Sequence, residues 1–124
     1  MNTSGATRIV AVLDDDVAVR ESLQFSLELE GFAVIMAATG QELEERLGRE
    51  SFDCLIVDYH LPGTNGLDVL AALRQRKIEA PAILITGNPN EQIRRRAAAD
   101  GAVLVEKPFA VDSLVEQIYS LLDR

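Results

Sequence analysis

The chain has 124 residues, the ordinary size of one domain and enough to bury a hydrophobic core. Its 20 acidic residues against 12 basic ones give a formal net charge of −8, which argues against direct nucleic acid binding by this domain. No apolar run approaches the roughly 20 residues that cross a bilayer, and the start of the chain lacks the pattern of a signal peptide. We expect residues 1–7 to be a disordered tail and residues 8–124 to be a single domain without membrane association.

The first predicted elements are a strand and a helix joined by three acids. Residues 8–13 are a short β-rich run, and Asp14, Asp15 and Asp16 follow it directly. Residues 17–30 carry apolar side chains at helical spacing, and Gly31 ends this helix. The apolar positions fall in two rows, with small Ser22 tolerated: Ala18, Ser22, Phe25 and Leu29 in one row, and Val19, Leu23 and Leu27 in the next.

The organising stretch is residues 54–58, a continuous apolar run that ends on Asp58 and then passes into Pro62 and Gly63. Such a run is typical of a parallel-sheet strand buried on both faces. Its Cys54 is the single cysteine, which excludes an internal disulfide, so we expect a buried, inert thiol and a reducing, cytoplasmic location. Before this stretch, residues 32–37 predict a second strand, and Thr39 with Glu42 forms the capping box of a helix that ends near Gly48.

After the organising strand, a helix opens at residues 65–68, and residues 82–85 predict a fourth strand that ends on Thr86 and Gly87. In the next helix, which runs to Ala99, Asn88 reads as the N-cap and Pro89 as the first helical position. Because its interior offers one large apolar side chain, Ile93, we expect this helix to be weakly anchored. The arginines at positions 94–96 point in three directions and are interpreted as a solvated face.

Residues 103–105 predict a fifth strand that ends on Glu106 and Lys107, and a final helix follows. That helix carries one apolar stripe, formed by Val111, Val115, Ile118 and Leu122. Strict alternation of strands and helices with short connections predicts right-handed crossovers. The fold class is therefore α/β: a doubly wound, five-stranded parallel sheet flanked by five helices, of the flavodoxin-like type.

In a parallel sheet, the ends of the first, third, fourth and fifth strands open at one edge. This places Asp14, Asp15, Asp16, Asp58, Thr86 and Lys107 together. Several close carboxylates need a cation, and oxygen ligands suit Mg²⁺. Lys107 and Thr86 suit phosphoryl oxygens, so phosphoryl transfer to Asp58 is the indicated reaction class. Singly, each signal has a plainer interpretation as a turn or a cap; their joint placement favours a site.

These motifs resemble the receiver domains of two-component response regulators, and the FixJ/NarL-like branch most closely, over about residues 8–122. The matching motifs are the acids at 14–16, the Asp58-x-x-x-Pro62-x-x-x-Gly66 pattern, the Ile85-Thr86-Gly87 run and the Glu106-Lys107-Pro108-Phe109 turn. The resemblance implies a CheY-like fold and a phosphoacceptor rather than an enzyme, with at most self-phosphorylation and self-dephosphorylation activity.

The resemblance also implies a role for each site residue. Asp58 would take a phosphoryl group from a phosphohistidine on a sensor histidine kinase. Asp15 would bind Mg²⁺ directly and Asp14 largely through water, with Asp58 and the backbone carbonyl of His60 as further ligands, while Asp16 would cap the first helix. Lys107 would bridge Asp58 and then the phosphoryl group. Thr86 would swing inward and shift the face formed by the fourth helix, fifth strand and fifth helix, which is also the expected face of any homodimer.

Several alternatives remain at this stage. Leu104 stands where the family often has an aromatic switch residue, which keeps open a degenerate receiver acting only as a protein-interaction module. His60 reads as an exposed loop residue, or together with Asn88 as a modulator of phosphoryl lifetime. A haloacid-dehalogenase-type phosphatase would need an acid at position 60. A flavodoxin-like cofactor binder would need a phosphate-binding loop after the first strand, where three Asp residues would repel the phosphate.

Overall fold

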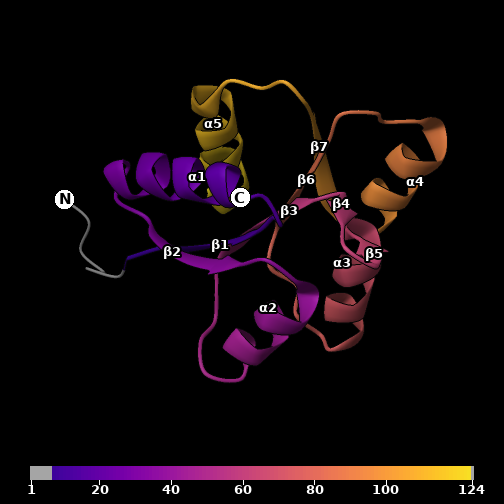
Figure 1. Cartoon of the computed structure of the whole chain (residues 1–124), viewed down its shortest axis with the longest axis horizontal. Coiled ribbons are helices and arrows are strands. Elements are labelled where there is room, and N and C mark those ends of the chain that lie inside the picture. Colours follow the sequence, from indigo (N-terminus) through magenta and orange to yellow (C-terminus); the bar gives the residue numbers. More distant parts are fainter. Residues whose placement is uncertain (1–6, 124) are drawn as a thin grey trace.

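The computed structural model describes residues 7–123, so most of the predicted tail at 1–7 lies outside the described residues. Five strands form one parallel sheet in the order β2 (Ala33–Ala37), β1 (Ile9–Leu13), β3 (Cys54–Asp58), β6 (Ala82–Thr86) and β7 (Ala102–Glu106) (Figure 1). Four helices connect the strands and a fifth follows the last strand: α1 (Val17–Leu29), α2 (Gly40–Leu47), α3 (Gly66–Gln75), α4 (Glu91–Ala99) and, after β7, α5 (Val111–Leu122). The predicted fold class is confirmed.

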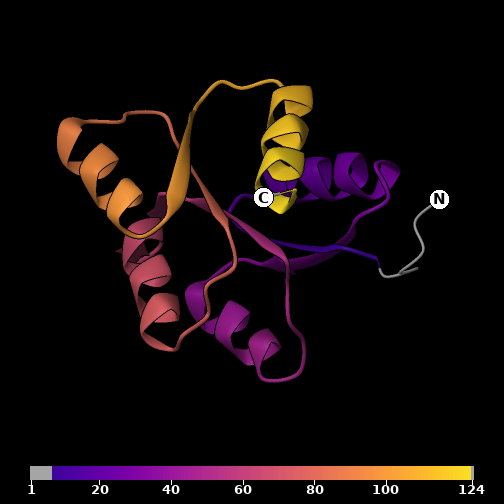
Figure 2. The same ribbon diagram turned by 180° about the vertical axis from the view of Figure 1, so that it is seen from behind.

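Helices cover both faces of the sheet, because successive strand residues point to opposite sides. Val12, Ile56 and Ile83 pack with the buried residues of α1 and α5, whereas Leu55 and Leu84 pack with those of α2, α3 and α4. Figures 1 and 2 show α1 and α5 together on one side of the strands and α2 and α3 on the other. The central strands are thus buried on both faces, as the apolar run at 54–58 predicted.

Only one of the two apolar rows of α1 packs against the sheet. Leu23 and Leu27 are buried, but Phe25 and Leu29 are 66% and 72% exposed, and Ala18 and Ser22 in the same row are exposed as well. At 3.6 residues per turn, the two rows are centred roughly 130° apart around the helix. A helix lying on one sheet face cannot bury both, so only one row packs.

Helix α4 begins later than predicted, since Asn90 rather than Asn88 is its N-cap and Pro89 precedes the cap. The side-chain oxygen of Asn90 accepts a hydrogen bond from the Ile93 N–H at 2.8 Å. Ile93 and Ala97 are its buried residues, which confirms a small apolar anchor. Polar contacts supplement that anchor: Arg96 pairs with Asp68 of α3, and Arg74 of α3 donates to the Asp100 carbonyl at 2.9 Å.

The segment after β3 holds a small antiparallel pair that the sequence analysis did not foresee. Strands β4 (His60–Leu61) and β5 (Thr64–Asn65) flank a turn at Pro62 and Gly63, where Gly63 has a φ of +73°. Pro followed by a glycine with positive φ is the pattern of a type II turn. The turn returns the chain to Asp58, because the Gly66 N–H donates to the Tyr59 carbonyl at 2.8 Å.

Within residues 7–123, no helix combines the length and apolarity needed to span a bilayer.

Candidate functional site

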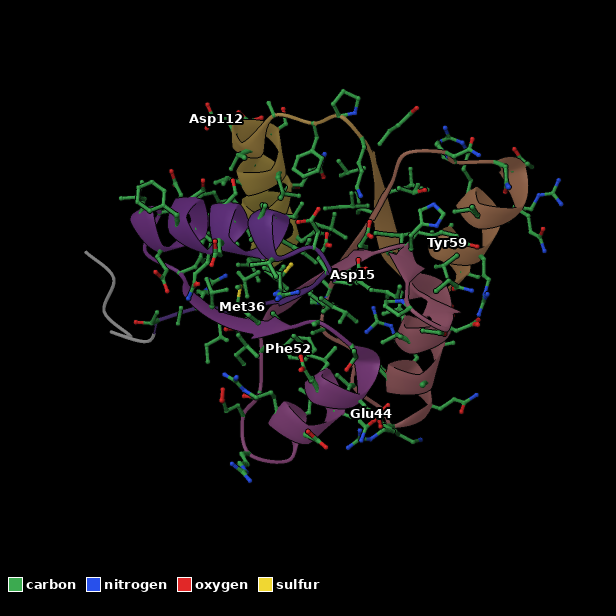
Figure 3. The ribbon with its side chains drawn as sticks, viewed as in Figure 1. Asp15, Met36, Glu44, Phe52, Tyr59 and Asp112 are labelled. Carbon is green, nitrogen blue, oxygen red and sulfur yellow. The ribbon has the colours of Figure 1, made fainter. Side chains whose placement is uncertain are left out.

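Three carboxylates meet at the carboxyl edge of the sheet. Asp14 and Asp15 follow β1 and Asp58 ends β3, and each has a carboxylate oxygen within 4.8 Å of the others. Asp14 and Asp58 are both 4% exposed, whereas Asp15 is exposed. Figure 3 shows Asp15 where the chain passes from β1 into α1. The predicted acidic cluster is therefore present, with two buried members and one that faces water.

The loop that carries the first two acids is held by its own hydrogen bonds. The Asp14 N–H donates to the Ala37 carbonyl of β2 at 3.1 Å, and the Asp14 Oδ1 accepts from the Asp16 N–H at 2.9 Å. The Asp16 side chain in turn accepts from the N–H groups of Ala18 and Val19 at the start of α1. Asp16 is thus the helix cap that the sequence analysis expected.

Lys107 supplies the positive charge of the site from the end of β7. Its Nζ lies 2.9 Å from Asp58 Oδ1, as a contact of charges rather than an aligned hydrogen bond. Burial lowers the pKa of Lys107, but the contact with Asp58 and the charges of Asp14 and Asp15 outweigh it and raise that pKa. The ammonium group therefore stays protonated beside the three acids.

The donor set fits a hard divalent cation. Burial raises the pKa of Asp14, the Asp16 N–H lowers it, and the neighbouring charges of Asp58 and Asp15 raise it further, with a net rise. Asp58 Oδ1 is buried and accepts no hydrogen bond from any residue in the range 7–123. An oxygen cluster with mutual repulsion, of which the Lys107 ammonium group balances only part, is suited to Mg²⁺, which binds carboxylates and retains water ligands.

The remaining predicted site residues lie around this cluster. Thr86 is fully buried at the end of β6, and its Oγ1 accepts from the Asn88 N–H at 3.2 Å. Its neighbour Ile85 is paired in register with Asp58, so Thr86 lies one residue further along the adjacent strand. His60 is exposed and lines a depression of about 500 Å³ together with Asp15 and Asp58.

Tyr59 and Cys54 lie in or next to β3. The Tyr59 ring meets the His60 imidazole edge-on, with ring centroids 5.1 Å apart, a contact that no sequence pattern indicated. Cys54 is fully buried, and burial raises the pKa of its thiol to about 12, as expected of an inert cysteine.

An acidic cluster with an adjacent lysine lies at the carboxyl edge of a 2-1-3-6-7 parallel sheet, which places the chain among the doubly wound α/β proteins whose ligand site is at that edge. The family model of the response regulator receiver domain matches residues 10–119. The chain therefore belongs to the response regulator receiver family. A receiver domain is a phosphoryl acceptor and not an enzyme in the usual sense.

Curated relatives support this membership. The transcriptional regulatory protein FixJ of Bradyrhizobium diazoefficiens is 33% identical over 114 residues, which cover 91% of this chain and 56% of FixJ. The phosphate regulon transcriptional regulatory protein PhoB of Rhizobium meliloti is 37% identical over 118 residues, which cover 93% of this chain and 52% of PhoB. The chain thus spans about half the length of the curated relatives it matches.

Solved structures agree with the fold. A CheY-like response regulator receiver domain protein from Methanospirillum hungatei superimposes with a TM-score of 0.89 at 28% identity, covering 95% of each chain. The beryllofluoride-activated NtrC4 receiver domain dimer gives a TM-score of 0.85 at 27% identity, covering 93% of this chain and 96% of that one.

Proposed function

We propose that Asp58 accepts a phosphoryl group from a phosphohistidine of a sensor histidine kinase. The observation that carries this proposal is the buried Asp58 carboxylate, 2.9 Å from the Lys107 ammonium group and clustered with Asp14 and Asp15. Among the acids of this edge, Asp58 combines burial with a cationic neighbour. It is thus a carboxylate placed to attack phosphorus while charge is neutralised around it.

Each neighbouring group has a distinct task in this transfer. An oxygen of Asp58 forms a bond to phosphorus while the phosphorus–nitrogen bond of the phosphohistidine breaks. Lys107 holds a phosphoryl oxygen as negative charge accumulates. Asp14, Asp15, Asp58 and the backbone carbonyl of His60 would hold Mg²⁺, which when bound supplies charge neutralisation at the phosphoryl oxygens.

Thr86 is proposed to couple phosphorylation of Asp58 to a shift of α4. Its hydroxyl would turn to the phosphoryl group, and α4 would follow because a short apolar anchor holds that helix. Leu104 is half-buried in β7 and lacks an aromatic ring, so the switch would operate without an aromatic partner. Backbone chemical shifts measured with and without beryllium fluoride test this; an unchanged α4 would contradict it.

The proposal also covers the dimer interface, the subfamily and the cellular location of the domain. A homodimer would use the face formed by α4, β7 and α5, with β7 between the two helices at the sheet edge (Figure 1). The FixJ/NarL-like branch is supported by the likeness to FixJ, although PhoB shares a comparable identity with this chain. A cytoplasmic location is supported by the names of both relatives, which describe transcriptional regulatory proteins.

Intact-mass analysis after incubation with acetyl phosphate tests the acceptor. The native chain should gain the mass of one phosphoryl group when Mg²⁺ is present, and Asp58→Asn should gain none. A shift of equal size in Asp58→Asn would show that another residue is the acceptor. If the native chain gains no mass from acetyl phosphate or from a phosphorylated kinase, the domain is a contact-only receiver, the alternative that Leu104 keeps open.

A further inference from the structure

Arg20, in the first turns of α1, folds back over the start of its own helix. Its guanidinium Nη1 donates to the backbone carbonyl of Asp14 at a distance of 2.7 Å. The Arg20 N–H meanwhile donates to the Asp16 carbonyl at 3.0 Å, as the regular helix requires. A cation near a helix N-terminus opposes the helix dipole, so the contact with Asp14 supplies a reason for arginine at this position.

The accepting carbonyl lies in the acidic loop itself. Among residues 7–123, the guanidinium of Arg20 is the group that donates to this oxygen. Arg20 is half-buried, so the hydrogen bond is partly shielded from competing water. A charged donor at 2.7 Å makes a short, strong contact that fixes the direction of the carbonyl.

That direction determines where Asp15 lies. The peptide unit that begins with the Asp14 carbonyl is planar and ends at the Asp15 Cα, so orienting the carbonyl orients the attachment of Asp15. Asp14 and Asp58 are held by burial, but Asp15 is exposed. The backbone is therefore the main restraint on the Asp15 carboxylate in the described structure.

From this geometry we infer that Arg20 is a positioning residue, which holds the Asp15 carboxylate in place for the divalent cation by fixing the preceding peptide plane. The inference rests on the proposed magnesium site. Arg20 touches neither metal nor phosphoryl group; it acts through the loop.

An NMR titration of the purified chain with MgCl₂ tests the role of Arg20. Arg20→Met keeps the apolar stem and removes the donor, and it should weaken Mg²⁺ binding roughly tenfold, as loss of outer-sphere support commonly does. Arg20→Lys keeps a charged donor and should recover most of the affinity. As a control, Arg49→Ala removes an exposed arginine from the loop between α2 and β3 and should leave the affinity for Mg²⁺ unchanged. Thermal unfolding in EDTA verifies that each variant folds; should Arg20→Met not fold, Arg20→Gln replaces it.

The decisive step repeats the substitution in an Asp15→Asn background. If Arg20 acts through Asp15, Arg20→Met should change the already weakened affinity less than about twofold there. Equal losses in the two backgrounds, or native affinity in Arg20→Met, would overturn the positioning role alone. A native chain that binds no Mg²⁺ would overturn the magnesium site and the role of Arg20 together.

Discussion

Asp14 is a buried acid whose burial and acidic neighbours raise its pKa, while Asp58 beside it has a lysine contact of its own. Folding therefore disfavours the ionised form of Asp14. Its contribution to stability is fully present below its unfolded pKa of 3.8 and is lost as the pH rises through the raised folded pKa. In the metal-free protein, repulsion from Asp58 and Asp15 therefore destabilises the ionised form of Asp14 in the folded state.

We expect Asp14→Asn to stabilise the metal-free protein. Asparagine keeps an oxygen for the Asp16 N–H and removes the charge. In EDTA, the excess free energy of unfolding of the variant should grow as the pH rises above 3.8 through the raised pKa. Urea unfolding at several pH values measures it. Saturating Mg²⁺ should shrink the difference, because the cation binds the native site more tightly. A difference that falls with rising pH would contradict this account.

Gly66 is required by the space around Asp58 rather than by its backbone angles. A Cβ at this position would lie 2.4 Å from the Asp58 carbonyl oxygen, a backbone atom that cannot move aside without moving the proposed phosphoacceptor. Gly66→Ala should therefore cost about 1–3 kcal/mol of stability and slow phosphorylation. Gly48→Ala is the matched control, since its nearest contact is 3.4 Å, and it should unfold at nearly the native urea concentration. Similar losses in both variants would show that the crowding at Asp58 is unimportant.

At the scale of the element, α1 presents two apolar rows with opposite environments. The Leu23 and Leu27 row is buried against the sheet and α5, and the Phe25 and Leu29 row lies in water. Helical periodicity describes both rows equally well. The position of the sheet beneath the helix decides which one contributes to stability.

Two alanine substitutions should separate the rows by their free energies of unfolding. Leu27→Ala deletes a fully buried side chain and should cost about 2–5 kcal/mol. Phe25→Ala removes a larger side chain that is 66% exposed and should change stability by about 0.5 kcal/mol or less. Chemical denaturation measures both. A loss at Phe25 as large as that at Leu27 would mean that the exposed row packs in solution.

At the scale of the whole molecule, the two helices that border the face proposed for dimerisation carry exposed charges of opposite sign. Arg94 and Arg95 are exposed on α4, and Asp112 and Glu116 are exposed on α5. A two-fold axis through this face would bring α4 of one copy toward α5 of the other. Opposite charges would then meet twice, which favours association at low ionic strength.

Sedimentation velocity in the presence of Mg²⁺ and beryllium fluoride should detect this dimer. Arg94→Glu places an acid opposite acids, so it should weaken the dimer severalfold, and added salt should weaken the native dimer. Arg49→Glu makes the same charge change away from this face and should leave dimerisation unaltered. Equal dimerisation of the native and Arg94→Glu chains would place the interface elsewhere.

The sheet and the location of the site could be predicted from the amino-acid sequence. Alternating strand and helix patterns admit few topologies, and parallel strands bring Asp14, Asp58 and Lys107 to one edge whatever the packing details. The cap at Asp16 and the burial of Cys54 were also predictable, because they depend on local sequence and on a strand covered on both faces.

Tertiary structure alone decided the features that depend on what lies nearby in space. Burial of one α1 row depends on the sheet beneath it. The N-cap of α4 is Asn90 rather than Asn88, because the start of this helix depends on where β6 ends in the sheet. The β4–β5 pair had a signal in its Pro-Gly turn, but its strands are two residues long and show no periodicity. The contact between Arg20 and the Asp14 carbonyl had no signal, because a backbone acceptor leaves no mark on side-chain pattern.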